Sequence, residues 1–201
     1  MSYVPRILAF AGSARTGSFN RKLVGIAARG AEEAGAEVDL VDLRDYPMPL
    51  YDGDLEERDG LPENAVRFKA LMMASQGLLI AAPEYNSSIT PLLKNTIDWA
   101  SRPAPGEERL AVFRNKTAAL MSASPGSLGG LRGLVHVRSI LSNIHVMILP
   151  DQVAVPGAHG AFAEDGRLKD EKRQAAVEGL GRNLAETLGR LHGAAALNRN
   201  A

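Results

Sequence analysis

The residues best suited to chemistry in this sequence form one short loop, Gly12–Asn20. Its polar members are Ser13, Arg15, Ser18 and Asn20, and it lies between an apolar run and a segment with helical periodicity. Such a loop cradles phosphate because backbone N–H groups, hydroxyls and the positive N-terminus of the helix all favour an anion. The Arg15 guanidinium adds a charge suited to two phosphate oxygens. The loop predicts a phosphorylated ligand, although Ser18 is equally suited to capping the helix.

Two further loops with unusual composition follow later strands. Pro83–Ser88 can present backbone groups and the Tyr85 ring to a flat ligand, but it also fits a plain turn with Ser87 or Ser88 capping the next helix. Ser122–Gly130 is rich in glycine, which allows close backbone approach to a ligand. Ser127 lacks the glycine two positions before it that a hydrolase nucleophile elbow needs, so we interpret it as a loop residue.

The elements that must position these loops alternate between strand and helix. Short apolar runs at 7–11, 37–41, 77–82, 117–122 and 145–149 predict strands, and helical stripes lie between them. This alternation favours a parallel sheet covered by helices on both faces. Five strands indicate the flavodoxin-like three-layer α/β/α sandwich with order 2-1-3-4-5, in which ligands bind at the C-terminal ends of the strands. A six-stranded dinucleotide fold is disfavoured because no G-x-G-x-x-G follows the first strand.

Two segments look irregular, and one aromatic residue is ambiguous. The ranges 44–60 and 101–115 are rich in proline, glycine and charge, and both are expected to be long surface loops. Trp99 lies at the edge of the apolar stripe of the helix expected near 89–100, so it fits either the edge of the core or a subunit interface.

Bulk composition excludes several classes of function. The 201 residues fit one domain, 1–201, and the 23 basic and 23 acidic residues cancel, which argues against nucleic acid or an anionic membrane as partner. The absence of cysteine excludes thiol and Cys-ligated metal chemistry, and the histidines have no ligand spacing, so no metal is expected. No apolar run is long enough to span a bilayer, and we expect a cytoplasmic protein.

Together the three loops resemble the signatures of a known family. The segment Gly12–Asn20 is similar to the GSxRxxSxN motif of the NADPH-dependent FMN reductases, which include flavodoxin-like quinone, chromate and azo-dye reductases. Pro83–Asn86 matches the PEYN motif of that family, and Ser124–Gly126 with Gly129 and Gly130 matches its third loop. The resemblance extends over nearly the whole chain, and Ser127 departs from the second glycine of many members.

The resemblance implies a site residue by residue. Ser13, Arg15, Ser18 and Asn20 would hold the FMN phosphate. Pro83, Glu84, Tyr85 and Asn86 would line the isoalloxazine, and Ser122, Ser124 and Gly126 would close its other side. Family members are usually homodimers or homotetramers with the flavin at a subunit boundary, and the helix near 89–100 is the usual dimer element.

The chemistry implied by the resemblance belongs to the cofactor. NADPH or NADH would pass hydride to flavin N5, and a quinone, chromate, azo compound or free flavin would then take the electrons in a ping-pong cycle. No side chain is assigned as catalytic. Arg132 and Arg138 fit the 2′-phosphate of NADPH, a partner subunit or a plain exposed helix face. A non-enzymatic electron carrier and a redox-sensing flavin-binding module remain alternatives, and a hydrolase is disfavoured.

Overall fold

The computed structural model describes residues 3–197 and contains a five-stranded sheet. Its strands are β1 (Arg6–Ala11), β2 (Glu37–Val41), β3 (Gly77–Ala81), β6 (Thr117–Ala123) and β7 (Met147–Val155). They lie in the order β2-β1-β3-β6-β7, and all neighbouring pairs are parallel. The predicted flavodoxin-like order 2-1-3-4-5 is therefore confirmed.

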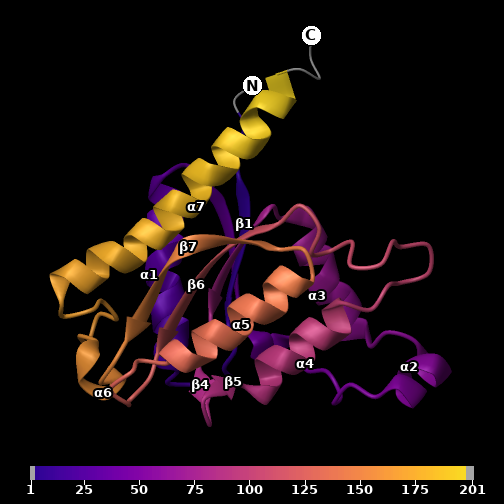
Figure 1. Cartoon of the computed structure of the whole chain (residues 1–201), viewed down its shortest axis with the longest axis horizontal. Coiled ribbons are helices and arrows are strands. Elements are labelled where there is room, and N and C mark those ends of the chain that lie inside the picture. The colour runs from indigo at the N-terminus through magenta and orange to yellow at the C-terminus, as the bar shows by residue number, and fades with distance from the viewer. Residues whose placement is uncertain (1–2, 198–201) are drawn as a thin grey trace.

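Helices cover both faces of this sheet (Figure 1). On one face lie α1 (Phe19–Glu33) and the long α7 (Glu171–Leu197), and on the other lie α3 (Glu63–Ala74), α4 (Pro91–Ala100) and α5 (Leu131–Asn143). The short elements are η1 (Leu43–Asp45), α2 (Gly53–Asp59), β4 (Glu84–Tyr85), β5 (Ser88–Ile89) and α6 (Ala158–Ala161). Figure 1 also shows the C-terminal end of α7 projecting past the sheet.

The central strands form because both of their faces are buried. Every residue of β3 and β6 is buried, which matches the nearly continuous apolar runs in the sequence. The helices α1 and α7 approach each other so closely that a Cβ on Gly181 would lie 1.8 Å from the carbonyl oxygen of Ala27. Only glycine fits at this crossing, so the backbones of the two helices lie in direct contact.

The last strand differs from its predicted range of 145–149. His145 has a positive φ of 73° and belongs to the turn that ends α5, and β7 continues to Val155. The sequence did not indicate this longer strand because Pro150 interrupts the apolar run. The edge strand tolerates the proline through an irregularity, in which Leu149–Asp151 lie opposite Ala119.

The segment 44–60, predicted to be a long surface loop, has no buried residue but is not irregular throughout. The segment contains α2, which Asp52 caps and which ends at Gly60 with a φ of 75°. None of the residues of α2 is buried, so the sequence shows no apolar stripe that could have indicated a helix.

The segment before α2 packs against α4 through the one tryptophan of the chain. Trp99 is fully buried, and its indole nitrogen donates to the carbonyl oxygen of Pro49 over 2.7 Å. Asn95 binds the same carbonyl at 2.9 Å and accepts from the backbone N–H of Tyr51 at 2.8 Å. Of the two interpretations of Trp99, the structure supports a residue in the interior of its own chain.

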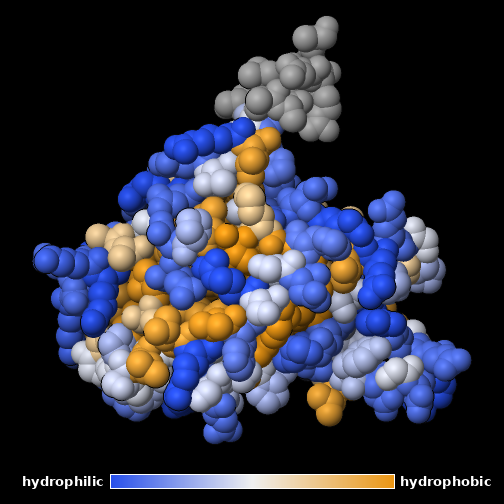
Figure 2. All heavy atoms as spheres, viewed as in Figure 1, coloured by the Kyte–Doolittle hydropathy of each residue, from blue (hydrophilic) through white to orange (hydrophobic). Residues whose placement is uncertain are grey.

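The surface shows one region where apolar side chains gather. Figure 2, viewed from the same side as Figure 1, shows them near the middle of the face, in the region of α5 and β7. The exposed apolar residues of these two elements are Leu131, Val135 and Met147. Within the part of the chain that the structure describes, no helix has the length and apolarity needed to cross a membrane.

The ion pair between Glu56 and Arg102 predicts a pH-dependent contribution to stability. The hydrogen bonds from Arg102, both 2.8 Å, hold the pKa of Glu56 below its usual range. A lowered folded-state pKa stabilises the fold above the unfolded pKa, about 4.3, and this stabilisation is lost as the pH falls through the folded value. Glu56→Gln should therefore lower the free energy of unfolding by about 0.5–1 kcal/mol at pH 7, since the pair is partly exposed.

Urea denaturation between pH 7 and pH 3 measures this effect. The difference between Glu56→Gln and the unmodified protein should vanish near the acid end, and the exposed neighbour variant Glu57→Gln should show no difference at any pH. A constant difference across the whole range would contradict the assignment.

Candidate functional site

The three predicted loops meet at the C-terminal edge of the sheet, where hydrogen bonds join them. The first loop continues β1, and the backbone N–H of Gly12 donates to Ala81 of β3 at 2.9 Å. Thr90, the N-cap of α4, donates its hydroxyl to the carbonyl of Gly12 at 2.7 Å and accepts from the N–H of Leu93 at 3.2 Å. The start of α4 therefore holds the first loop in place.

The first loop carries several backbone donors that the protein itself does not use. Within this loop, five N–H groups have no acceptor in the described part of the chain, those of Ala14, Thr16, Gly17, Phe19 and Asn20. The last two begin α1, where backbone N–H groups have no partner inside the helix. A run of free N–H groups at a helix N-terminus is the donor set that a phosphate requires.

Three serines predicted for the site can each still donate a hydrogen bond from the hydroxyl to a ligand. Ser13 accepts from the N–H of Arg15, Ser18 accepts from the N–H of Arg21, and Ser124 accepts from the N–H of Gly126, each at 3.3 Å. Each oxygen thus accepts one bond, and none of these hydroxyls donates to another group in the described range. Ser18 does cap α1, and the cap leaves its proton available to a ligand.

Asn20 joins the first loop to the third. Its side-chain nitrogen donates to the carbonyl of Ala123 at 2.8 Å, and its side-chain oxygen accepts from the N–H of Ala123 at 2.9 Å. Asn20 is buried, and this pairing satisfies the last residue of β6 beyond the end of its ladder with β3. The side chain therefore positions the two loops relative to each other.

The second loop is a small hairpin of β4 and β5 rather than a plain turn. Asn86 and Ser87 at its tip both have positive φ, 50° and 67°, which matches the turn that joins two-residue hairpins. Tyr85 is half exposed. Neither Ser87 nor Ser88 caps the next helix, because Thr90 has that role.

The carboxylate of Glu84 fastens this hairpin to α5. Its oxygens accept from the guanidinium of Arg132 at 3.0 and 3.1 Å and from the N–H of Gly133 at 3.1 Å. A second link joins Ser88 to His136 at 2.9 Å. Glu84 therefore faces α5, and the remaining surface of the hairpin consists of backbone and the Tyr85 ring.

The third loop places its predicted residues at different depths. Ser122 belongs to β6 and is completely buried, and its hydroxyl has no hydrogen-bond partner in the part of the chain that the structure describes. It lies beneath Gly130, where a Cβ would come within 1.9 Å of the Ser122 oxygen. Gly126 is exposed at the tip of the loop, so it and Ser124 lie nearer to the surface than Ser122.

Sequence reasoning missed an ionic cluster beside the first loop. Asp42, at the end of β2, accepts from the guanidinium of Arg21 at 2.8 Å and from that of Arg44 at 2.7 Å. Arg44 also donates to the hydroxyl of Thr16 at 3.3 Å. Burial acts to raise the pKa of Asp42, but the hydrogen bonds from Arg44 and the charge of Arg21 outweigh it and keep the pKa below its usual range.

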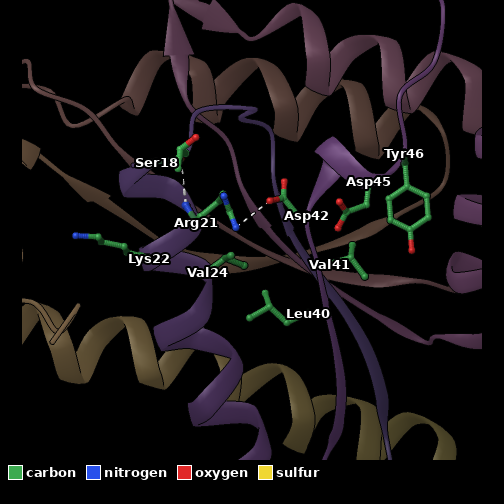
Figure 3. A pocket seen from close by; sticks show the side chains of 10 residues that line it. Ser18, Arg21, Lys22, Val24, Leu40, Val41, Asp42, Asp45 and Tyr46 are labelled. Carbon is green, nitrogen blue, oxygen red and sulfur yellow. Dashed lines mark hydrogen bonds and ion pairs between the residues drawn. The ribbon is translucent and has the colours of Figure 1, made fainter.

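A pocket of about 540 Å³ opens beside this cluster (Figure 3). It lies between the N-terminal part of α1 and the C-terminal end of β2, and only Thr16 and Ser18 of the first loop line it. The pocket is therefore a neighbour of the predicted site and is not enclosed by the three loops. The only sequence signal for it was the pair of charged residues directly after β2.

The two arginines of α5 that were candidates for contacting the 2′-phosphate of NADPH both have partners within the chain. Arg132 binds Glu84, as described above. Arg138 donates to the carbonyl of Leu149 at 3.0 Å and to the side-chain oxygen of Gln152 at 3.1 Å, which fastens α5 to β7.

The order of the sheet and the helices on its two faces define a flavodoxin-like fold. The family model for NADPH-dependent FMN reductases matches residues 5–160. The chain belongs to this family, and the expected enzyme class is confirmed: it is a flavin-dependent oxidoreductase that uses NAD(P)H.

Individual proteins support this placement. An NAD(P)H-dependent FMN reductase of Pseudomonas aeruginosa is 36% identical over 175 residues, which cover 86% of this chain and 89% of that protein. An NAD(P)H:quinone oxidoreductase of Solanum tuberosum is 38% identical over 174 residues, covering 84% of this chain and 85% of the potato protein. The solved structure of FerB, a flavoenzyme NAD(P)H:acceptor oxidoreductase from Paracoccus denitrificans, superposes with a TM-score of 0.74 at 28% identity, covering 92% of this chain and 98% of FerB.

The bonds of Asn20 to Ala123 predict that Asn20→Ala destabilises the protein strongly. The change leaves a buried N–H and a buried carbonyl without partners, and each such group costs about 1–3 kcal/mol. We expect the free energy of unfolding to fall by about 2–4 kcal/mol in urea denaturation. The exposed helix residue Asn143 provides a matched control, since Asn143→Ala removes the same side chain without a buried partner. Equal losses in the two variants would contradict the structural role of Asn20.

Proposed function

We propose that the first loop binds the phosphate of FMN. The observation that supports this most directly is the set of free N–H groups at Ala14, Thr16, Gly17, Phe19 and Asn20. The hydroxyls of Ser13 and Ser18 add donors next to them, and the Arg15 side chain makes no hydrogen bond or ion pair within residues 3–197. Its charge is therefore free to meet a phosphate dianion.

The hairpin and the third loop then form the two sides of the isoalloxazine site. We assign Pro83–Asn86 to one side through their backbone, with the Tyr85 ring at the margin. Ser124 and Gly126 form the other side, and Asn20, Glu84 and Ser122 support these loops from within. Since Glu84 is paired with Arg132, it contributes rigidity rather than proton transfer.

Bound FMN supplies the redox chemistry, accepting hydride from NAD(P)H and returning electrons to an oxidant. The chain binds and orients the flavin, and its backbone donors stabilise negative charge on the reduced ring. The exposed surface around Tyr85 and Leu128 suits a flat organic acceptor. We therefore propose quinones, azo compounds or free flavin as acceptors in a ping-pong cycle; the names of the relatives, which include quinone reductases and an NADPH azoreductase, support this.

A homo-oligomer is proposed as well. Leu131 and Val135 of α5 are 42% and 59% exposed, next to the hairpin and the third loop. Such a pair of apolar residues on one helix supports a second copy packed beside the flavin site. The family resemblance assigns α4 to the interface, but the side chain of Trp99 in α4 is buried within its own chain.

A spectroscopic titration tests the proposed function. Purified protein is saturated with FMN, and NADPH is added without oxygen. The absorbance of oxidised flavin should be lost and should return when a quinone is added. Bound flavin that NADPH cannot bleach would indicate a carrier or sensor, and failure to bind FMN would contradict the whole site.

Removal of the Arg15 charge tests the phosphate assignment separately. Arg15→Ala should weaken FMN binding by about 1.5–3 kcal/mol, the usual contribution of a hydrogen bond to a charged group. Fluorescence quenching of FMN measures the affinity. Arg29→Ala, on the exposed side of α1, is the control and should bind FMN normally. Unchanged FMN affinity in Arg15→Ala would remove Arg15 from the site.

A further inference from the structure

The edge of the sheet opposite the three loops carries another pocket, and we propose that it binds a phosphate dianion, free or as part of a small organic ester. The pocket has a volume of about 370 Å³ and lies where α4 and α5 end and where the chain approaches β6 and β7. In a parallel sheet, the crossover helices end beside the starts of the strands that follow them. β6 has seven residues, so roughly 20 Å separates this pocket from the proposed flavin site.

The walls of the pocket are cationic. Its basic members are Arg102, Arg109, Arg114 and His145, and none of its lining residues is acidic. Arg102 is neutralised by its ion pair with Glu56. Within residues 3–197, the side chain of Arg109 forms no hydrogen bond or ion pair, and that of Arg114 donates only to the carbonyl of Arg109, at 3.4 Å. Two guanidinium groups without a counter-ion thus line one pocket, and their charge matches that of a dianion.

The helix ends beside the pocket do not account for these two charges. Carbonyl groups at a helix C-terminus attract cations, but the last turns of α4 and α5 are closed by backbone hydrogen bonds. The carbonyl of Ile97 accepts from Ser101 at 2.9 Å, and that of Leu141 accepts from Val146 at 3.1 Å. Within the described range, neither of the two guanidinium groups donates to a carbonyl of either helix. Both remain available to a ligand.

The backbone around the pocket is strained at three positions. Apart from the tip of the hairpin, the non-glycine residues with positive φ among residues 3–197 are Leu110 (60°), Asn115 (61°) and His145 (73°). Leu110 and His145 line the pocket, and Asn115 directly follows Arg114. A residue with a Cβ enters the left-handed region at an energetic cost, and such residues cluster at ligand sites. The two strained segments of this chain are therefore the hairpin of the proposed flavin site and the surroundings of this pocket.

His145 occupies a position that ordinarily belongs to glycine. The helix α5 ends in a Schellman motif, in which Val146 donates to the carbonyl of Leu141 at 3.1 Å and His145 donates to that of Ser142 at 3.2 Å. The left-handed residue of this motif is usually glycine, because glycine adopts it without a steric penalty. A histidine there is exposed on the wall of the pocket, and its ring N–H adds a donor to the two guanidinium groups.

The remaining walls of the pocket suit the carbon part of an ester. The side chains of Leu110 and Ile144 line it and are only partly buried. Its volume lies in the range of pockets that hold small organic molecules, so a phosphate ion alone would leave space beside it. Free phosphate and a phosphate ester share the group that the arginines bind, and the binding experiment therefore includes both.

Calorimetry with inorganic phosphate and, separately, phenyl phosphate tests the pocket without relying on turnover. The protein is saturated with FMN and freed of unbound flavin, so the first loop is occupied, and chloride keeps the ionic strength constant. Saturable binding of one ligand per chain supports the proposal. Tighter binding of phenyl phosphate identifies an ester as the ligand, and equal affinity identifies the free ion.

Benzoate provides the matched probe, because it has the same ring and only one negative charge. It should bind at least about tenfold more weakly than phenyl phosphate, the effect of one charge-assisted hydrogen bond. No saturable binding of either phosphate compound, or equal affinity for benzoate and phenyl phosphate, would overturn the proposal.

Variants of the two arginines assign the binding to the pocket. Arg109→Ala and Arg114→Ala should each weaken phosphate binding at least about tenfold and leave FMN affinity and NADPH oxidation within about twofold. Arg109→Lys should recover part of the loss, since it restores the charge without the guanidinium fork. Arg190→Ala, which changes an exposed arginine of α7, is the control and should have no effect. Unchanged phosphate affinity in both alanine variants would contradict the proposal.

His145→Gly separates ligand binding from folding. The change removes a strained side chain at the end of α5, so the urea midpoint of unfolding should rise, while phosphate binding should weaken at least about threefold. A residue with a structural role alone would not move the two measurements in opposite directions. A raised midpoint with unchanged phosphate affinity would remove His145 from the site.

Discussion

The proposed site depends on one constraint, the set of backbone N–H groups in the first loop that have no acceptor within residues 3–197. Unpaired backbone donors are normally costly, and native chains keep them only where water or a ligand can bind them. Here the loop cannot relax to pair them internally. Thr90 holds its start at Gly12, Asn20 holds its end at Ala123, and Arg44 contacts Thr16 in the middle. The loop is thus held from both ends and from its middle, as the proposed phosphate site requires.

Three of the side chains predicted for the site support the protein rather than a ligand. Asn20 binds Ala123, and Glu84 binds Arg132 and Gly133. Ser122 is buried beneath Gly130. In the flavin site proposed above, the remaining surface therefore consists largely of backbone groups and hydroxyls, which would orient the cofactor and stabilise charge on it without exchanging protons. This division explains why the sequence contains no acid–base pair of the kind that a hydrolase needs.

The sequence predicted the order of the sheet and the place of the loops because both follow from local patterns. Wholly apolar runs such as Leu78–Ala82 indicate buried parallel strands, and parallel strands bring their C-terminal loops to one edge. Features set by long-range contacts were not predictable. The bulge that lets β7 continue past Pro150, the amide of Asn20 facing Ala123, and the pairing of Asp42 with Arg21 all depend on residues distant in the chain. The exposed helix α2 was not predicted because it has no buried face and therefore no apolar stripe in its sequence.

The most direct test of the phosphate cradle compares the affinities of FMN and riboflavin, which differ only in the phosphate, on the same preparation. If the free N–H groups and Arg15 bind that phosphate, FMN should bind at least about 100-fold more tightly than riboflavin, since several charge-assisted bonds are lost together. Affinities within about threefold of each other would contradict the account, because the first loop would then contribute nothing to flavin binding.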